Sequence, residues 1–309
     1  MAHNIETLFY TREKPWHGLG TMVAEAPTSA DALRLAGLDW KVESKPVFTE
    51  QGNVIEGYKA NTRDSDGSVL GIVSGRYSIC QNEEAFAFTD ELIGGEVHYE
   101  TAGSLSGGRR IWLLAKMENT TLAGDEVEPY LCFTNTHDGS GAVRACMTPV
   151  RVVCNNTLNV ALSTASRSWS TKHVGKVQEK IIEAQRALEL AGAYMDELAK
   201  YADQMANKSI NTDKIREILD ELFPVKEDDS ERVKENSRRI KNEYMVCYFM
   251  PDLEKFRGTA WGALNAMADM VDHNAPRRQT ENYAENNWSR IIDGHTLVDA
   301  MATKLAAVK

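Results

Sequence analysis

The residues best suited to acid–base or metal chemistry lie together in one polar run, from His137 to Gly141. The imidazole of His137 and the carboxylate of Asp138 could act as a general base or supply two ligands to a metal ion. Nothing near them in the sequence completes a coordination sphere, and Asp-Gly is common in ordinary turns. We therefore favour a plain turn, and an enzyme that uses His137, Asp138 and Arg144 remains an alternative.

Nucleophilic catalysis would need a thiol beside a base, and Cys154 with His173 would form such a pair. Cys154, however, ends an apolar strand-like run, where a packed thiol is expected. The five cysteines are scattered and include no CxxC pair, which argues against a structural zinc or a redox centre. The glycine-rich runs at residues 103–108 and 139–141 lack the spacing and the lysine of a P-loop. We expect no metal, nucleotide or other cofactor, and a binding protein rather than an enzyme.

The distribution of charge along the chain is uneven. The chain has 35 Lys and Arg against 45 Asp and Glu, a net charge of −10, which argues against a protein that coats duplex DNA. Residues 1–138 hold 11 basic and 21 acidic residues, residues 139–180 hold 6 and 1, and residues 181–309 hold 18 and 23, giving −10, +5 and −5. One locally basic stretch therefore lies within an acidic chain.

Single-stranded nucleic acid is bound where positive charge for phosphates accompanies aromatic faces on which bases stack. The basic stretch and the strand-like segments before it contain both kinds of residue. The predicted nucleic-acid-binding residues are Arg109, Arg110, Trp112, Arg144, Arg151, Arg167, Trp169, Lys172 and Lys176. The structural alternative is that Trp112 and Tyr99 belong to the core and the arginines form a solvated face.

Arg151 precedes a predicted helix that begins at Asn155 and Asn156. A helix N-terminus beside an arginine concentrates backbone N–H groups and positive charge, which suits a phosphate. Equally, Asn155 could cap the helix while Arg151 pairs with an acidic side chain from the first 138 residues.

The elements that must position these residues change in kind near residue 170. Before it, alternating or β-branched runs predict strands at residues 40–48, 54–62, 68–73, 97–105, 110–117, 130–136 and 142–153. The first three are separated by turn residues and predict a meander. Asn82 precedes an amphipathic run that ends at Gly94, and a second short helix is expected at residues 157–165, followed by a polar linking stretch to His173.

The second half of the chain has helical periodicity. Helices are expected at residues 177–206, 212–222, 231–249, 259–273 and 282–304, the last with a break at Gly294. A chain of 309 residues, 42% of them hydrophobic, predicts two domains. We therefore expect an α+β protein, with a β-rich domain of meander strands and interspersed helices at residues 1–170 and an all-α domain at residues 171–309.

Four segments of the chain resemble a known family. They are KPWHGLG at residues 14–20, AGLDW at 36–40, VRVVCNNTL at 150–158, and GTAWGALN at 258–265 with Asp272-His273. Together they resemble the phage/plasmid-like protein family built on domain of unknown function 932. The resemblance spans nearly the whole chain and implies a gene carried by phages, prophages or plasmids, with no enzyme activity that can be transferred to particular residues.

A second resemblance concerns topology. The order of strands, helix and strands, followed by a basic helix, is similar to that of the single-strand annealing recombinases of phages. Together with the basic stretch, it favours single-stranded DNA binding or strand annealing in phage or plasmid replication or recombination. The alternative is an interaction protein that inhibits or decoys a host defence system, for which an acidic surface would be natural.

Location and assembly can also be predicted. Residues 1–20 lack a basic region followed by an apolar run, and no run approaches the roughly 18 apolar residues of a membrane span. We therefore expect a cytoplasmic protein without a membrane partner. Aromatic residues of the helical half could support a homo-oligomer, although packing in that half's own core is favoured. They are Tyr244, Tyr248, Phe249, Phe256 and Trp261.

Overall fold

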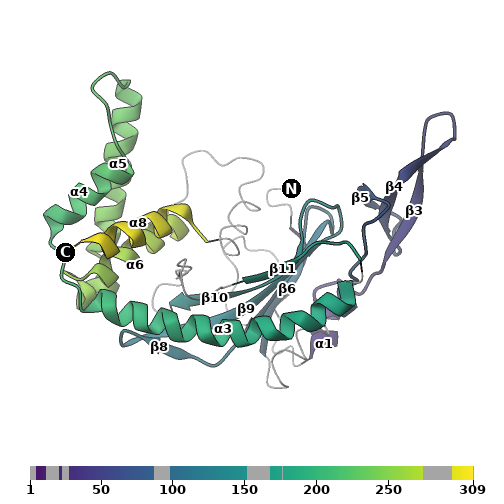
Figure 1. Cartoon of the computed structure of the whole chain (residues 1–309), viewed down its shortest axis with the longest axis horizontal. Helices are drawn as coiled ribbons and strands as arrows, with labels where there is room; N and C mark the ends of the chain where they lie inside the picture. The colour runs from purple at the N-terminus through teal and green to yellow at the C-terminus, as the bar shows by residue number, and fades with distance from the viewer. Residues whose placement is uncertain are drawn as a thin grey trace. The chain divides into compact units, whose positions relative to one another are not determined.

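The computed structural model describes residues 5–11, 21–22, 28–86, 98–151, 168–175, 177–273 and 294–308. It is a mixed α and β structure, in which strands and one short helix precede a series of helices, as the sequence predicts (Figure 1). By clustering of contacts the chain divides into two compact units, neither of them one continuous stretch. The strand-rich unit comprises residues 1–117, 130–147 and 167–192, and the helical unit comprises residues 118–129, 148–166 and 193–309.

The larger sheet is built mainly from antiparallel strands in the order β11-β10-β9-β7-β6-β1-β2, with β8 beside β9. Its strands are β1 (Ile5–Tyr10), β2 (Thr21–Met22), β6 (His98–Leu105), β7 (Arg110–Lys116), β8 (Thr120–Leu122), β9 (Asp125–Thr136), β10 (Val143–Arg151) and β11 (Ser168–Thr171). Alternate residues of β7, namely Ile111, Leu113 and Ala115, are fully buried. Because strand side chains alternate between faces, these three place the core on one face of the sheet.

The first described helix, α1 (Ser29–Leu35), packs against β1 and β6. Thr28 caps it, since its side chain accepts a hydrogen bond from the backbone N–H of Asp31. The helix ends at Gly37, whose φ of +65° is a conformation that glycine adopts without strain. The apolar residues that follow, including Leu38, are buried against the sheet's core.

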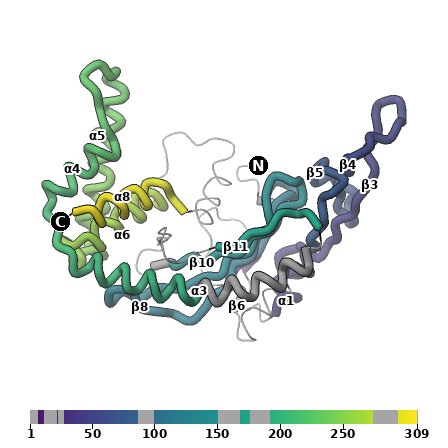
Figure 2. Tube along the Cα trace, in the orientation of Figure 1, coloured from purple at the N-terminus to yellow at the C-terminus, as the bar shows by residue number. Residues whose placement is uncertain are grey.

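A second, three-stranded antiparallel sheet has the order β3-β4-β5 and is the predicted meander. Its strands are β3 (Val42–Phe48), β4 (Val54–Arg63) and β5 (Val69–Ser74), and we call residues Val42–Ser74 the arm. The hairpin of β3 and β4 extends beyond β5 (Figures 1 and 2), because β5 pairs with β4 only from Tyr58 to Thr62.

The helical elements begin and end close to the predicted positions. They are α3 (Val177–Ala206), α4 (Thr212–Leu222), α5 (Glu231–Tyr248), the 3₁₀ helix η1 (Pro251–Phe256), α6 (Ala260–His273) and α8 (Thr296–Ala307). Asn211 caps α4, because its side chain accepts from the backbone N–H of Lys214. The core of the helical unit includes Trp261 and Tyr244, both 0% exposed. No helix among the described residues is both long enough and apolar enough to cross a membrane.

Three local predictions need correction. The polar stretch before His173, expected to be a link, contains β11, which pairs with β10. The side chain of Asn82 does not cap the helix that starts there, because it points into the interior and donates to the carbonyl of Leu38. Instead the carboxylate of Glu84 accepts from the backbone N–H of Gln81. The short helix expected at 157–165 and the first part of the one expected at 282–304 lie outside the described residues.

Candidate nucleic-acid interface

The larger sheet ends at β11, where basic and aromatic side chains from separate segments meet. Arg144 on β10 lies opposite Ser170 of β11, and Trp169 of β11 lies opposite Ala145. Cross-strand partners share a face and successive residues alternate, so Arg144 and Trp169 lie on opposite faces of the same edge. Lys172 follows directly after β11 and is exposed.

A fourth residue, Arg76, is brought to this edge by an isolated bridge between Tyr77 and Val174. The backbone N–H of Ser78 also donates to the carbonyl oxygen of His173, at 2.9 Å. In this antiparallel register Arg76 lies beside Gly175, close to Lys172. We define the basic edge as Arg76, Arg144, Trp169 and Lys172.

The basic edge keeps its positive charge because no acidic side chain accompanies it. Residues 139–175 include no Asp or Glu. Arg76 and Lys172 are exposed, and neither forms an ion pair within the described part of the chain. Trp169 is half-buried, so part of its ring faces solvent. The edge can therefore contact both a negatively charged group and a planar apolar one.

Behind the basic edge lies a layer of buried polar side chains, the polar seam, defined as Asn61, Asn82, Asn135, His137 and His173. Three of them are held by alternate residues of one extended segment. The Nδ1 of His173 is 3.0 Å from the carbonyl oxygen of Ser78, and the amide of Asn135 donates to the carbonyl of Cys80 at 2.9 Å. The Nε2 of His137 is 2.9 Å from Oδ1 of Asn82.

The polar seam also fastens the arm to the larger sheet. The amide of Asn61 on β4 donates to the carbonyl of His137 at 2.7 Å. A Cβ at Gly71 on β5 would lie 2.4 Å from Cα of Asp138, so the two backbones approach more closely than any other residue would allow. Glycine is therefore required at this point of contact.

Hydrogen bonding shows that both seam histidines are neutral. The amide of Asn82 already donates to the carbonyl of Leu38, so its Oδ1 accepts from His137. Burial, followed by the nearby His173 and Arg63, lowers the pKa of His137 to about 3. Burial also lowers the pKa of His173, against opposing effects of the Ser78 carbonyl and Asp138. The charge of the basic edge therefore comes from arginine and lysine alone near neutral pH.

The ring of His173 stacks on Tyr77, with centroids 4.4 Å apart and planes 13° from parallel. The hydroxyl of Tyr77 donates to the carbonyl of Thr136. Burial raises the pKa of this hydroxyl well above its usual value. Both residues are buried, so they position the backbone of the basic edge and present no ring face to a ligand.

The structure argues against catalysis at the polar turn. His137 is 0% exposed with its ring bonded to Asn82, and Asp138 accepts from the backbone N–H of Ser140 in a local turn. Arg144 lies on β10 opposite Ser170, apart from this turn. His173 is buried against Tyr77, and Cys154 lies outside the described residues. Within the described ranges, no three His, Cys, Asp or Glu side chains are arranged to hold a metal ion.

The structure brings together only part of the predicted nucleic-acid-binding set. Trp112 is 5% exposed and so belongs to the core, as does Tyr99. Arg109 is exposed at the turn before β7, and Arg110 begins that strand in a half-buried position. Arg151 ends β10, but its side chain is not described, and Arg167, Lys176 and the helix expected after Asn155 also lie outside the described residues.

Arg76 was not predicted. It lies in a turn about 100 residues before the segment that it joins, and only the Tyr77–Val174 bridge brings the two together. Its neighbours Gly75 and Tyr77 are common turn and strand residues, and no local pattern distinguishes this arginine from any other.

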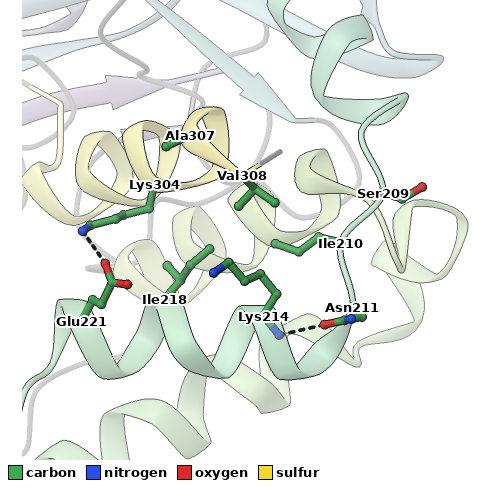
Figure 3. Close-up of a pocket in the computed structure, with 9 residues that line it drawn as sticks. All are labelled: Ser209, Ile210, Asn211, Lys214, Ile218, Glu221, Lys304, Ala307 and Val308. Carbon is green, nitrogen blue, oxygen red and sulfur yellow. Dashed lines mark hydrogen bonds and ion pairs between the residues drawn. The ribbon is translucent and has the colours of Figure 1, made fainter.

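The helical unit contains a separate pocket of about 660 Å³ between α4 and α8 (Figure 3). Its lysines, Lys214 and Lys304, are paired with Glu217 and Glu221. Because these cations are already neutralised, the pocket has no excess charge that would select an anionic ligand.

A family model described as a domain of unknown function (DUF932) matches residues 69–291, which is 223 of the 309 residues. The chain belongs to the DUF932 family. This confirms the predicted family, and the basic edge lies entirely within the matched residues, whereas β3 and β4 precede them. No curated protein and no solved structure matches the chain.

Proposed function

We propose that this protein binds single-stranded DNA along the basic edge, in strand annealing or a related step of phage or plasmid replication or recombination. The observation that supports the proposal most is the meeting of Arg76, Arg144 and Lys172 at one sheet edge, from three separate segments. A chain with a net charge of −10 needs such a concentration of positive charge to attract phosphates.

Trp169 favours a single strand over a duplex. Its half-buried ring lies at the end of the sheet, where an unstacked base can reach it. Bases of a single strand are free to stack on aromatic rings, whereas those of a duplex are already stacked on one another. With Arg144 on one face of the edge and Trp169 on the other, a strand that follows β11 would present phosphates and bases to different faces.

The test is fluorescence anisotropy of a labelled single-stranded oligonucleotide and of the matching duplex, over a salt series. We expect the single strand to bind more tightly and its affinity to fall as salt rises. The double variant Arg144→Ala/Lys172→Ala is expected to weaken binding at least roughly tenfold and to reduce the salt dependence by roughly one counterion per lost phosphate contact.

The matched control is Arg34→Ala/Lys200→Ala, which also removes two positive charges. Both side chains are about two thirds exposed and distant in sequence from the basic edge. A wild-type chain that shows no salt-dependent binding would refute the proposal. Equal losses in the two double variants would show an effect of net charge alone and would also refute it.

Trp169→Ala separates stacking from charge. We expect it to weaken binding roughly tenfold at every salt concentration, because stacking, worth about 1–3 kcal/mol per base, is not screened by ions. Trp169→Phe should retain most of the affinity, and an unchanged affinity for Trp169→Ala would remove the tryptophan from the binding surface.

A further inference from the structure

The arm exposes large apolar side chains to an unusual degree. Five of them are between 53% and 60% exposed, namely Phe48, Val54, Tyr58, Val69 and Ile72. An exposed apolar cluster of this kind usually marks an interaction surface. The arm therefore needs an explanation beyond its own folding.

The register of the arm separates its two faces. Ala60 lies opposite Ile72, and Tyr58 lies opposite Ser74, so Tyr58, Ala60 and Ile72 share one face. Asn61, by contrast, belongs to the other face and bonds to His137 of the larger sheet. The face that carries Tyr58 and Ile72, which we call the outer face, thus remains exposed.

The far end of the arm is thin as well as apolar. The pair Phe48 and Val54 lies beyond the part of β4 that β5 covers. A two-stranded ribbon is only marginally stable in water, and three strands with one apolar face generally need a covering layer. Both facts favour an arm that is covered when the protein functions.

The charge of the arm indicates which partner would cover it. Val42–Arg63, which forms β3 and β4, holds three acidic residues (Glu43, Glu50, Glu56) and three basic ones (Lys45, Lys59, Arg63), hence a net charge of zero. A neutral surface offers nothing to phosphates, but it lets two copies of a chain that carries −10 approach without local repulsion.

The outer face is also complementary to itself. Glu43 lies opposite Thr62 and Lys45 opposite Ala60, so both charges point to the outer face of β3, where they are 3.4 Å apart. A two-fold axis would set Glu43 of one copy against the partner subunit's Lys45, and the reverse. Pro46 lacks the N–H needed to extend the sheet from the edge of β3, which favours packing of faces over pairing of edges.

We propose that the outer face of the arm is a self-association surface, on which a second copy of this chain packs its own arm, face to face, about a two-fold axis. Tyr58 and Ile72 would form the apolar centre, and Glu43 with Lys45 the charged rim. The proposal does not depend on DNA binding.

The test is sedimentation equilibrium of the full chain over a salt series. We expect a dimer that persists or tightens as salt rises, because salt screens the repulsion between two acidic chains and strengthens apolar burial. DNA binding should weaken under the same conditions, so failure of either proposal can be recognised separately. A chain that stays monomeric at all concentrations and salt levels would overturn the inference.

Tyr58→Ser/Ile72→Ser is expected to weaken the dimer at least roughly a hundredfold, because both residues would lie at the centre of the interface. The matched control, Val233→Ser/Val246→Ser, changes two side chains that are 45% and 62% exposed on α5 of the helical unit. It should leave the dimer unchanged. Dimerisation that survives the first variant, or is lost in the control, would contradict the assigned surface.

A charge exchange provides a second test that does not disturb the apolar residues. Glu43→Lys should weaken the dimer roughly tenfold, because it places like charges together across the two-fold axis. Glu43→Lys/Lys45→Glu should restore it, since the exchange occurs in both copies. A lack of rescue would count against the proposed two-fold packing.

Discussion

The polar seam and the arm both depart from the rule that apolar residues are buried and polar ones exposed, but in opposite directions. His137 and Asn135 are 0% exposed in the seam, whereas Tyr58 and Ile72 in the arm are more than half exposed. The seam's departure is explained within the chain, because its side chains find hydrogen-bond partners there. The arm's departure is not explained within the chain, and it therefore points to another molecule.

Truncation of the seam should cause the largest loss. His137→Ala removes a fully buried ring that bonds to Asn82 and contacts Trp40, with centroids 5.5 Å apart. We expect the free energy of unfolding to fall by about 3 kcal/mol, from the cavity and from the lost partner of Asn82. Urea denaturation measures this change.

The control for this variant is His273→Ala at the end of α6, where the side chain is 46% exposed. It should change the free energy of unfolding by less than about 0.5 kcal/mol. If the two variants behaved alike, the seam would not be the structural element that the comparison requires.

Acid should weaken the seam without affecting the exposed face of the arm. The folded-state pKa of His137 is lowered to about 3, so the unfolded chain binds a proton first as the pH falls below about 6.5. Stability is thus complete above pH 6.5 and is lost progressively below it, by about 2 kcal/mol at pH 5 from His137 alone. His173, whose pKa is also lowered, adds to the loss in the same direction.

Urea denaturation at a series of pH values between 7 and 5 measures this dependence. His137→Ala should show a shallower fall than the wild-type chain, because one of the two titrating groups is gone. Parallel curves for the two proteins would mean that His137 is not neutral and buried as described.

The contact between the two regions can be tested with a single methyl group. Gly71→Ala places Cβ against the backbone of Asp138, so the arm must shift. We expect a loss of about 1.5 kcal/mol in the free energy of unfolding, with faster amide hydrogen exchange in the arm. Gly192→Ala on α3, where the added Cβ meets nothing within 4 Å, should instead stabilise the chain by up to about 1 kcal/mol.

Local patterns in the sequence predict much of the secondary structure. The strands of the arm follow from alternation and from the turns at Gly52 and Gly67, and both glycines have positive φ. The predicted helix at residues 177–206 coincides with α3, because a long periodic run is the strongest local signal. The short strand β11 was missed, since Ser168–Thr171 has few strand-forming residues and is a strand only through pairing with β10.

Burial was harder to predict than secondary structure. His137 follows a strand within a glycine-rich turn, a place where polar residues are usually exposed, yet Asn61 and Asn82 enclose it from segments 55 or more residues away. Trp112 was a candidate for base stacking, but the alternation along β7 does not show which face of the strand is covered. In the helical unit Tyr244, Tyr248, Phe256 and Trp261 are core residues, whereas Phe249 is half exposed.

The sequence alone determined the order of strands and helices, the uneven charge and the membership of a family, because these depend on local composition and on short motifs. Only the tertiary structure decided which cations share the basic edge, which histidines are buried and which face of the arm is open. These follow from strand register and from contacts between residues up to about 100 positions apart. Such contacts form only when the whole core is buried, and no local segment encodes them.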